Sequence, residues 1–329
     1  MNQHRKYVFT ARVKQQPQPE ARAISAYSQF RRPVYIFGKP VAKDIIFTNH
    51  RNIYKKKVEN RQRLLMVKIP FINSFLEDGE LIMLVTSGYA PLTRLERFLL
   101  RYLTVFQRRA LFVFTNHRML YIPTTFTYDY RYSIAEIRYA DCHSIEVSGR
   151  SLFFIFHNGE SQIFPYIGRM ERRKLHSLLG ELPVGENPSG TQNMTYLCAQ
   201  CNTPIPQDSP ACPNCRLQFW TAAEAGKKAL LIPGGGYFYM GNTLYGVASA
   251  ILEILLAVLL ILSAVDMYHG LKGSVIAVTF LSMALAGLKA VTFFHAQELV
   301  QGCFPVMGRP SSVKPYRRMI YASTKGDLT

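Results

Sequence analysis

Two runs of almost unbroken apolar residues lie near the C-terminus, at 243–265 and 274–296. Each run contains one charged side chain, Glu253 in the first and Lys289 in the second. About 20 apolar residues suffice to cross the hydrocarbon core of a bilayer as a helix. The alternative is a pair of core helices in a large soluble domain, but such helices normally keep a polar face and these runs have none. The pattern therefore predicts two transmembrane helices.

The link between the two runs, residues 266–273, is short enough to make them an antiparallel hairpin with both chain ends on one side. It carries a single lysine, Lys272, whereas several basic residues flank the outer ends of the hairpin. These are Lys227, Lys228, Arg309, Lys314, Arg317 and Arg318. The positive-inside rule then places both termini in the cytoplasm. We expect a multi-pass protein of a bacterial inner membrane; a basic, acid-poor N-terminus leaves the mitochondrial inner membrane as the alternative.

Glu253 and Lys289 are the two charges inside the predicted spans. In an antiparallel hairpin their depths differ by only about 4–5 Å at 1.5 Å rise per residue. An isolated charge at such a depth costs about 2.5–3.5 kcal/mol on insertion scales. We expect Glu253 and Lys289 to pair within the chain or with a partner. The alternative is that Lys289 reaches the cytoplasmic surface while Glu253 is protonated.

The middle of the chain changes to short runs rich in Val, Ile, Phe and Tyr, which predict β-strands. Asn158-Gly159 and Ser148-Gly149 between such runs are hairpin turn signals. Apolar residues then recur at helical spacing over 169–182, which predicts an amphipathic helix. The predicted strands are 80–88, 110–116, 118–123, 127–133, 143–148, 152–158 and 160–166.

Residues 92–109 interrupt the strand pattern with a predicted helix. Leucine and aromatic residues share one face, and Arg94, Arg97, Arg101 and Arg108 share another. A basic helix with such a face suits the plane of a membrane interface. The alternative is an ordinary helix that covers the open side of the sheet structure.

The stretch Phe114-Thr115-Asn116-His117-Arg118-Met119-Leu120-Tyr121, with Tyr132 to Ile137 after it, resembles the bacterial pleckstrin-homology and GRAM-like domains. The resemblance covers roughly residues 76–183, and we assign 64–183 to this domain. It implies a small, partly open β-barrel capped by a C-terminal helix, often in a membrane-proximal or protein-docking role. It implies no catalytic residue.

The five residues Phe47 to Arg51 are repeated as Phe114 to Arg118. An identical repeat of this length predicts two similar hairpins whose turns are formed by Thr-Asn-His-Arg.

Four cysteines form two Cys-x-x-Cys pairs, Cys198 with Cys201 and Cys212 with Cys215. Two such pairs on tight turns place four thiolates tetrahedrally, as in a zinc ribbon. A redox pair or two disulfides are the alternatives, disfavoured for cytoplasmic thiols without a βαβ context. Four sulfur ligands leave no open position, so the predicted Zn site is structural. We assign 184–196 to a Pro/Gly/Ser-rich linker and 197–220 to the ribbon.

The segment 221–242 approaches the first apolar run through Pro233-Gly234-Gly235-Gly236-Tyr237-Phe238-Tyr239-Met240-Gly241. This stretch resembles a turn in small bacterial helical-hairpin membrane proteins, where Pro-Gly-x-Gly precedes the first spanning helix. A phosphate-binding loop is excluded because no Gly-Lys-Ser/Thr follows the glycines.

The net charge of the 329 residues is +18, and residues 1–63 alone contribute +12. This N-terminal arm includes Lys55, Lys56 and Lys57, and the tail 297–329 is also basic. With a membrane hairpin in the same chain, anionic lipid headgroups are the nearest abundant counter-charge. An acidic protein partner is the alternative. Nucleic acid is disfavoured because the ribbon lacks interleaved aromatic and basic residues.

These patterns together predict a multidomain α+β membrane protein: a small β-barrel with a C-terminal helix, a zinc ribbon and two antiparallel transmembrane helices. We expect it to act without enzymatic activity, as a docking or lipid-sensing platform on the cytoplasmic face. The alternative function is an accessory or assembly subunit of a larger membrane complex, with an unidentified protein partner. No nucleophile with a base, no paired acids and no open metal site can be identified in the sequence.

Overall fold

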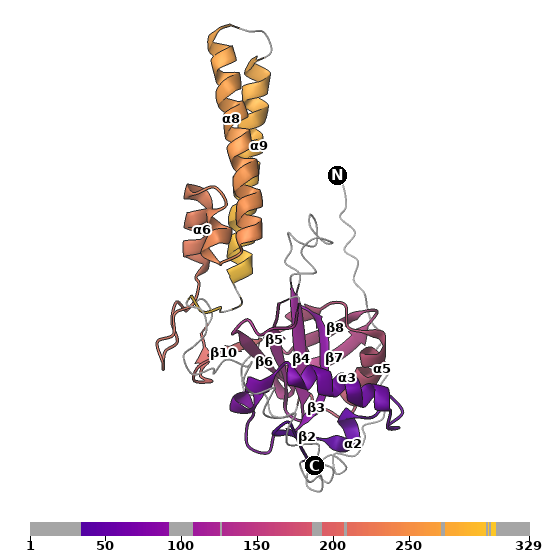
Figure 1. Cartoon of the computed structure of the whole chain (residues 1–329). Helices are drawn as coiled ribbons and strands as arrows, with labels where there is room; N and C mark the ends of the chain where they lie inside the picture. The colour runs from indigo at the N-terminus through magenta and orange to yellow at the C-terminus, as the bar shows by residue number, and fades with distance from the viewer. Residues whose placement is uncertain are drawn as a thin grey trace, which may run out of the picture. The chain divides into compact units, whose positions relative to one another are not determined.

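The computed structural model describes residues 34–91, 108–125, 127–185, 193–206, 209–270, 274–300, 302 and 304–306. Every structural statement below concerns these residues. Figure 1 shows the helices and strands along the chain.

The largest sheet is almost entirely antiparallel, with only β2 and β3 parallel to one another. Its strand order is β1-β2-β3-β4-β5-β6-β10-β11. The strands are β1 (Val34–Ile36), β2 (Lys39–Val41), β3 (Ile82–Tyr89), β4 (Arg109–Thr115), β5 (Arg118–Pro123), β6 (Ile134–Arg138), β10 (Thr195–Leu197) and β11 (Pro204–Ile205).

The central strands of this sheet are buried on both faces, because their side chains alternate between two separate apolar clusters. On β4, Phe112 and Phe114 enter one cluster while Leu111 and Val113 enter the other. The second cluster is covered by α3 (Lys56–Val67) and the 3-10 helix η1 (Pro70–Phe75), with the short helix α2 (Lys43–Ile46) beside them. Two buried faces explain why these strands are nearly continuous apolar runs in the sequence.

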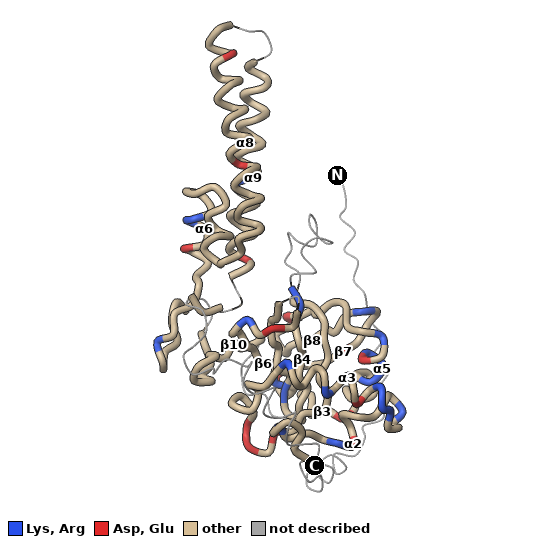
Figure 2. The backbone as a smooth tube through the Cα atoms, in the orientation of Figure 1, with Lys and Arg blue, Asp and Glu red and all other residues tan. Residues whose placement is uncertain are grey.

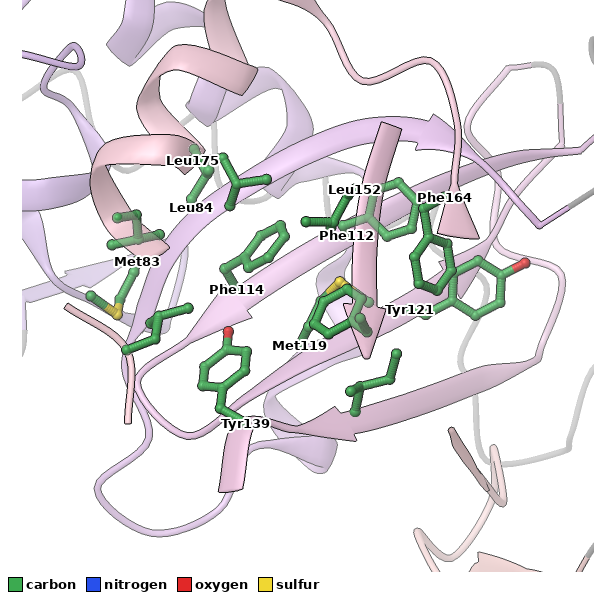
Figure 3. Close-up of a cluster of buried hydrophobic side chains, with 14 of the residues drawn as sticks. Met83, Leu84, Phe112, Phe114, Met119, Tyr121, Tyr139, Leu152, Phe164 and Leu175 are labelled. Atoms are coloured by element: carbon green, nitrogen blue, oxygen red, sulfur yellow. The ribbon is translucent and has the colours of Figure 1, made fainter. Parts of the chain in front are cut away.

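The first cluster lies between the large sheet, a three-stranded antiparallel sheet and one helix. The strands of the small sheet are β7 (Cys142–Ser148), β8 (Ser151–Phe156) and β9 (Ser161–Phe164), preceded by the 3-10 helix η3 (Tyr139–Asp141). The helix α5 (Arg169–Leu179) places Leu175 and Leu178 against this cluster. Figure 3 shows its aromatic centre, where Phe112, Tyr121 and Phe164 lie together.

Among the described strands, β1, β2, β6, β10 and β11 were not predicted, one predicted strand is not formed, and the barrel is unconfirmed. Residues 127–133 are not a strand; Tyr128 and Tyr132 have positive φ, which breaks an extended strand, and β6 begins only at Ile134. The described strands form two open sheets, and within the described chain no barrel is closed. The mostly β domain with a closing helix over 169–179 is as expected.

Two predicted boundaries also move. Most of the predicted helix 92–109 lies outside the described residues, but Arg109 already pairs with Tyr89 as the first residue of β4. The boundary at Arg63 falls inside α3, and residues such as Ile36, Ile46 and Phe47 belong to the core. The β domain therefore includes residues from 34 onward that the sequence analysis assigned to a basic arm.

The C-terminal part contains four helices, α6 (Ala222–Leu231), α7 (Gly235–Tyr239), α8 (Thr243–Tyr268) and α9 (Ser274–Val300). The two long apolar helices are thereby confirmed, each extending a few residues past its predicted end. By length and composition both suffice to cross a membrane. Figure 1 shows α8 and α9 side by side, with α6 along one half of their length.

Candidate metal centre and charged sites

The two Cys-x-x-Cys pairs form two turns with matching backbone geometry. In the first, Asn202 N–H donates to the Cys198 carbonyl at 2.9 Å, and Cys198 N–H donates to the Thr203 carbonyl. In the second, Arg216 N–H donates to the Cys212 carbonyl at 3.0 Å, and Cys212 N–H donates to the Leu217 carbonyl. Asn202 and Arg216, each directly after its second cysteine, both have φ of +59°. The local sequence thus builds the same turn twice.

The two turns bring all four sulfur atoms within 4.8 Å of one another. The Cys198 and Cys215 Sγ atoms are 3.4 Å apart, and those of Cys201 and Cys212 are 3.5 Å apart. Tetrahedral zinc with Zn–S bonds of about 2.3 Å requires S···S separations of about 3.8 Å. A disulfide requires about 2.05 Å. The predicted cluster is confirmed, its geometry suits a metal ion such as zinc, and its cysteines are free thiols.

The polar groups around the cluster act differently on its thiols. Burial acts to raise the pKa of Cys201, but hydrogen bonds with Thr203 and with neighbouring thiols outweigh it and lower that pKa to about 6. Burial raises the pKa of Cys198 well above its ordinary value. Outside the cluster, burial raises the pKa of Cys142 to about 12, so this thiol stays protonated and unreactive. Cys303 lies outside the described residues.

The ribbon is joined directly to the large sheet. β10 pairs antiparallel with β6, with Tyr196 opposite Ala135, and also with β11 of the ribbon. The predicted linker 184–196 therefore ends in a strand, and only its residues 186–192 lie outside the described chain. On the far side of the ribbon, Trp220 N–H donates to the Phe304 carbonyl at 3.0 Å. The chain segment after α9 thus returns to the end of the ribbon.

Glu253 and Lys289 lie opposite one another on α8 and α9. Lys289 Nζ is 2.7 Å from Glu253 Oε2, and Ser249 Oγ donates to the other carboxylate oxygen at 3.0 Å. The Glu253 side chain is 2% exposed and that of Lys289 is 23% exposed. In addition, Lys289 Nζ donates to the Ala229 carbonyl at 3.0 Å. This carbonyl is among the last four of α6, which lack partners within a helix.

The predicted basic residues are placed only in part. Lys55, Lys56 and Lys57 are exposed at the start of α3, where Lys56 Nζ lies 4.0 Å from Glu59. Arg94, Arg97 and Arg101 lie outside the described residues. Arg108 is half-buried and donates to the Pro91 carbonyl at 2.9 Å. The Arg108 guanidinium therefore makes a hydrogen bond within the chain.

A basic hollow on the β domain was not predicted. It has a volume of about 570 Å³ and lies between α5 and the β7–β8 turn. Arg169, Arg172, Arg173 and His176 of α5 line it together with His50. The four α5 residues recur at helical spacing, which was a usable signal in the sequence. His50 could not be assigned, because only the fold brings its loop to α5, where Lys174 Nζ donates to Thr48 Oγ1 at 2.7 Å.

The two copies of Phe-Thr-Asn-His-Arg occupy different surroundings. The second forms the β4–β5 turn, and its Arg118 is buried with bidentate hydrogen bonds to Glu80 at 3.0 and 2.8 Å. Arg118 also pairs with Glu136. Burial acts to raise the pKa of Glu80, but the hydrogen bonds and charge of Arg118 outweigh it and lower that pKa. The first copy is a short loop closed by a single bridge between Thr48 and Tyr54, with Arg51 exposed.

No protein-family model, characterised protein or solved structure matches this chain.

Proposed function

We propose that this chain is a non-enzymatic integral membrane protein, anchored by α8 and α9, that presents its β domain and metal-binding ribbon as a docking or lipid-sensing platform. The observation that carries the proposal is the exposure of the two apolar helices. Only 6% of the most apolar window of each helix is buried within the chain. A core helix of a soluble protein is mostly buried, whereas a spanning helix turns its apolar side chains to lipid. Figure 2 shows how few charges interrupt α8 and α9.

In this proposal both termini lie in the cytoplasm of a bacterium, on the side where the flanking lysines and arginines gather. The four-cysteine cluster holds zinc with a structural role: the ion ties the two turns together and supplies no open coordination position. The β domain belongs to the pleckstrin-homology or GRAM-like class, which is supported by its two sheets and its closing helix α5.

The lipid-sensing part is supported by the basic hollow on α5. Three arginines and two histidines line it, and guanidinium groups are suited to bidentate contact with phosphate oxygens. Lys55, Lys56 and Lys57 add exposed positive charge at the start of α3, which pairs with α5 through Arg61 and Glu171. Basic residues near a membrane surface contribute about 1 kcal/mol each and are screened by salt.

Vesicle binding tests this part. Residues 1–221, which stop before α6, should bind vesicles containing phosphatidylserine at low salt and release them at high salt. The double substitution Arg172→Gln with Arg173→Gln should weaken binding more than Lys68→Gln with Arg138→Gln, which removes the same charge outside the hollow. Circular dichroism checks that each variant is folded. Absence of binding at low salt would remove lipid sensing and leave docking to a protein.

The alternative function, an accessory subunit of a membrane complex, is supported by Gly287 on α9. A Cβ atom at Gly287 would meet nothing within 4 Å, so a spanning helix of another protein has room to approach closely. Gly246, in contrast, already accommodates Phe238 of the same chain. A stoichiometric protein that copurifies in mild detergent, and is lost with Gly287→Leu, would favour this function.

A further inference from the structure

The segment 222–240 packs tightly on the helices that we propose to span the membrane. Small residues permit this packing: a Cβ at Gly226 would lie 2.7 Å from the Phe293 ring, and one at Gly236 would lie 2.8 Å from Ala296 Cβ. Ala225, Ala229, Tyr237, Met240, Ala296 and Val300 form a buried cluster at this contact. The helices α6 and α7 are therefore fixed against α9.

The contacts also give the direction of α6. Gly226 lies beside Phe293 and Gln297, whereas the Ala229 carbonyl accepts from Lys289. Later residues of α6 thus contact earlier residues of α9. The helix α6 therefore runs antiparallel to α9, and its C-terminal end points toward the middle of the α8–α9 hairpin. After the turn at Gly234, α7 brings the chain back, since Gly236 lies beside Ala296.

Two independent contacts give the depth of the turn between α6 and α7. Lys289 is seven residues before the end of the second apolar run, which corresponds to about 10 Å at 1.5 Å per residue. On the other helix, Gly234 (φ +65°) lies against Gly246 and Ala250, and a side chain there would overlap the Gly246 carbonyl oxygen. Gly246 and Ala250 are three and seven residues after the start of the first run, which corresponds to about 5 and 10 Å. The contacts with both helices therefore place the turn within about the first 10 Å of the apolar runs.

The side chains at this turn are apolar and exposed. Leu230, Leu231 and Ile232 are 52%, 81% and 52% exposed, and Pro233 follows them. The charged residues of α6 precede this tip: Glu224 in the first turn pairs with Lys227 at 3.0 Å, and Lys228 stands in the last turn. Lys228 Nζ lies 4.2 Å from the Tyr239 ring centre. Along α6 the charged residues therefore stop at Lys228, and residues 229–233 at its tip are uncharged.

Three hydrogen bonds satisfy backbone groups near the tip, as a lipid environment favours. Ile232 N–H donates to the Lys228 carbonyl, Gly235 N–H donates to the Ile232 carbonyl, and Lys289 occupies the Ala229 carbonyl. An amphipathic helix lying in the membrane plane would instead show an apolar face along its whole length.

We infer that α6 and α7 form a re-entrant hairpin that enters the cytoplasmic leaflet and leaves on the same side, with Leu230, Leu231 and Ile232 among lipid acyl chains. The inference rests on the proposed membrane anchoring by α8 and α9. We assign lipid acyl chains as the neighbours of Leu230, Leu231 and Ile232, because this apolar surface is continuous with that of α8 and α9 and lies beside their apolar residues.

The single tryptophan of the chain, Trp220, makes the depth measurable. The full chain is reconstituted in phosphatidylcholine vesicles whose acyl chains carry bromine, a contact quencher of tryptophan fluorescence. In the native chain, Trp220 reports the depth at the base of α6. In a Trp220→Phe background, Leu231→Trp reports the depth of the tip. In the same background, Leu259→Trp reports the middle of α8. Ile232→Trp in the same background is a second probe of the tip.

We expect brominated vesicles to quench the tip probes and the α8 probe strongly, with blue-shifted emission, and to quench native Trp220 least. If the α8 probe is quenched but the tip probes at 231 and 232 are quenched no more than Trp220, the re-entrant hairpin is wrong. The proposed anchoring by α8 and α9 would then stand. An α8 probe that also escapes quenching would contradict the proposed anchoring itself.

Discussion

Arg118 shows how the same residue type acquires different roles in two copies of one sequence. In the β4–β5 turn its side chain is 3% exposed and contacts Glu80, Glu136 and the Phe75 carbonyl. The matching Arg51 of the first copy is exposed. An arginine buried among carboxylates orders the groups around it, because each buried charge needs its partner.

Replacing Arg118 should therefore be far more damaging than replacing a neighbouring arginine. Arg118→Met leaves Glu80 buried without its cation and removes one of the two arginines that pair with Glu136, and we expect the free energy of unfolding to fall by about 3–5 kcal/mol. Arg138 pairs with Glu136 and Glu77 but is 40% exposed, so Arg138→Met should lower it by less than about 1 kcal/mol. Urea unfolding of the full chain in detergent measures both. Equal losses would show that burial of Arg118 is unimportant.

The four-cysteine cluster was predictable at the residue scale, because two Cys-x-x-Cys pairs at this spacing form turns that bring their thiols together. The environment of Arg118 was not, since its partners Glu80 and Glu136 lie 38 and 18 residues away and only the strand register joins them. The basic hollow was predictable only in part. Helical spacing groups the arginines of α5, but His50 comes from a loop more than a hundred residues earlier, so only the fold brings it to the hollow.

Metal analysis tests the cysteine assignment. We expect the purified chain to carry zinc, and Cys201→Ser to lose most of it, because three thiolates and a hydroxyl no longer complete the tetrahedral set. Cys142→Ser is the matched control and should retain the metal, since Cys142 lies buried in the β domain apart from the cluster. The zinc content of each variant is measured by elemental analysis after dialysis. Zinc bound equally by both variants would contradict the assignment.

At the scale of elements, the strands buried on two faces and the two long helices were predictable, because their apolar patterns are strong. The failures occur where the backbone turns. Positive φ at Tyr128 and Tyr132 prevents a strand in a stretch rich in tyrosine, and α3 begins in a lysine-rich sequence that we assigned to a basic arm. In both places tertiary contacts outweigh local composition.

Glycines decide how closely α7 approaches α9. Gly236→Ala would place its methyl group 2.8 Å from Ala296 Cβ and 2.9 Å from Ala229 Cβ, and we expect a loss of about 1–3 kcal/mol in stability. Gly287→Ala on α9 meets nothing within 4 Å and should instead add up to about 1 kcal/mol of helix propensity. Thermal unfolding of the full chain in detergent compares them. A neutral Gly236→Ala would mean that α7 is not held against α9.

The pair Glu253 and Lys289 joins α8, α9 and α6 through one ammonium group. Glu253→Gln and Lys289→Met each leave a partner without its counter-charge and should lower stability, whereas the double variant should lose less than the sum of the single losses. Denaturation in detergent micelles gives the three values. Fully additive losses would show that the two residues do not act as a pair.

At the scale of the whole molecule, the net charge of +18 and the exposed apolar helices have a common explanation in the proposed membrane anchoring. Part of the positive charge of residues 1–63 lies on the β domain and not on a separate basic arm, since residues from 34 onward belong to that domain. The sequence indicated the order of modules along the chain. It could not indicate that β10 joins the ribbon to the large sheet or that residues after α9 return to Trp220.

The most direct test of membrane anchoring is flotation of the full chain with lipid vesicles after washing at alkaline pH, which strips proteins bound only at the surface. If α8 and α9 span the bilayer, the full chain floats with the vesicles before and after the wash, whereas residues 1–221 are released. Recovery of the full chain in the soluble fraction after the wash would contradict membrane anchoring.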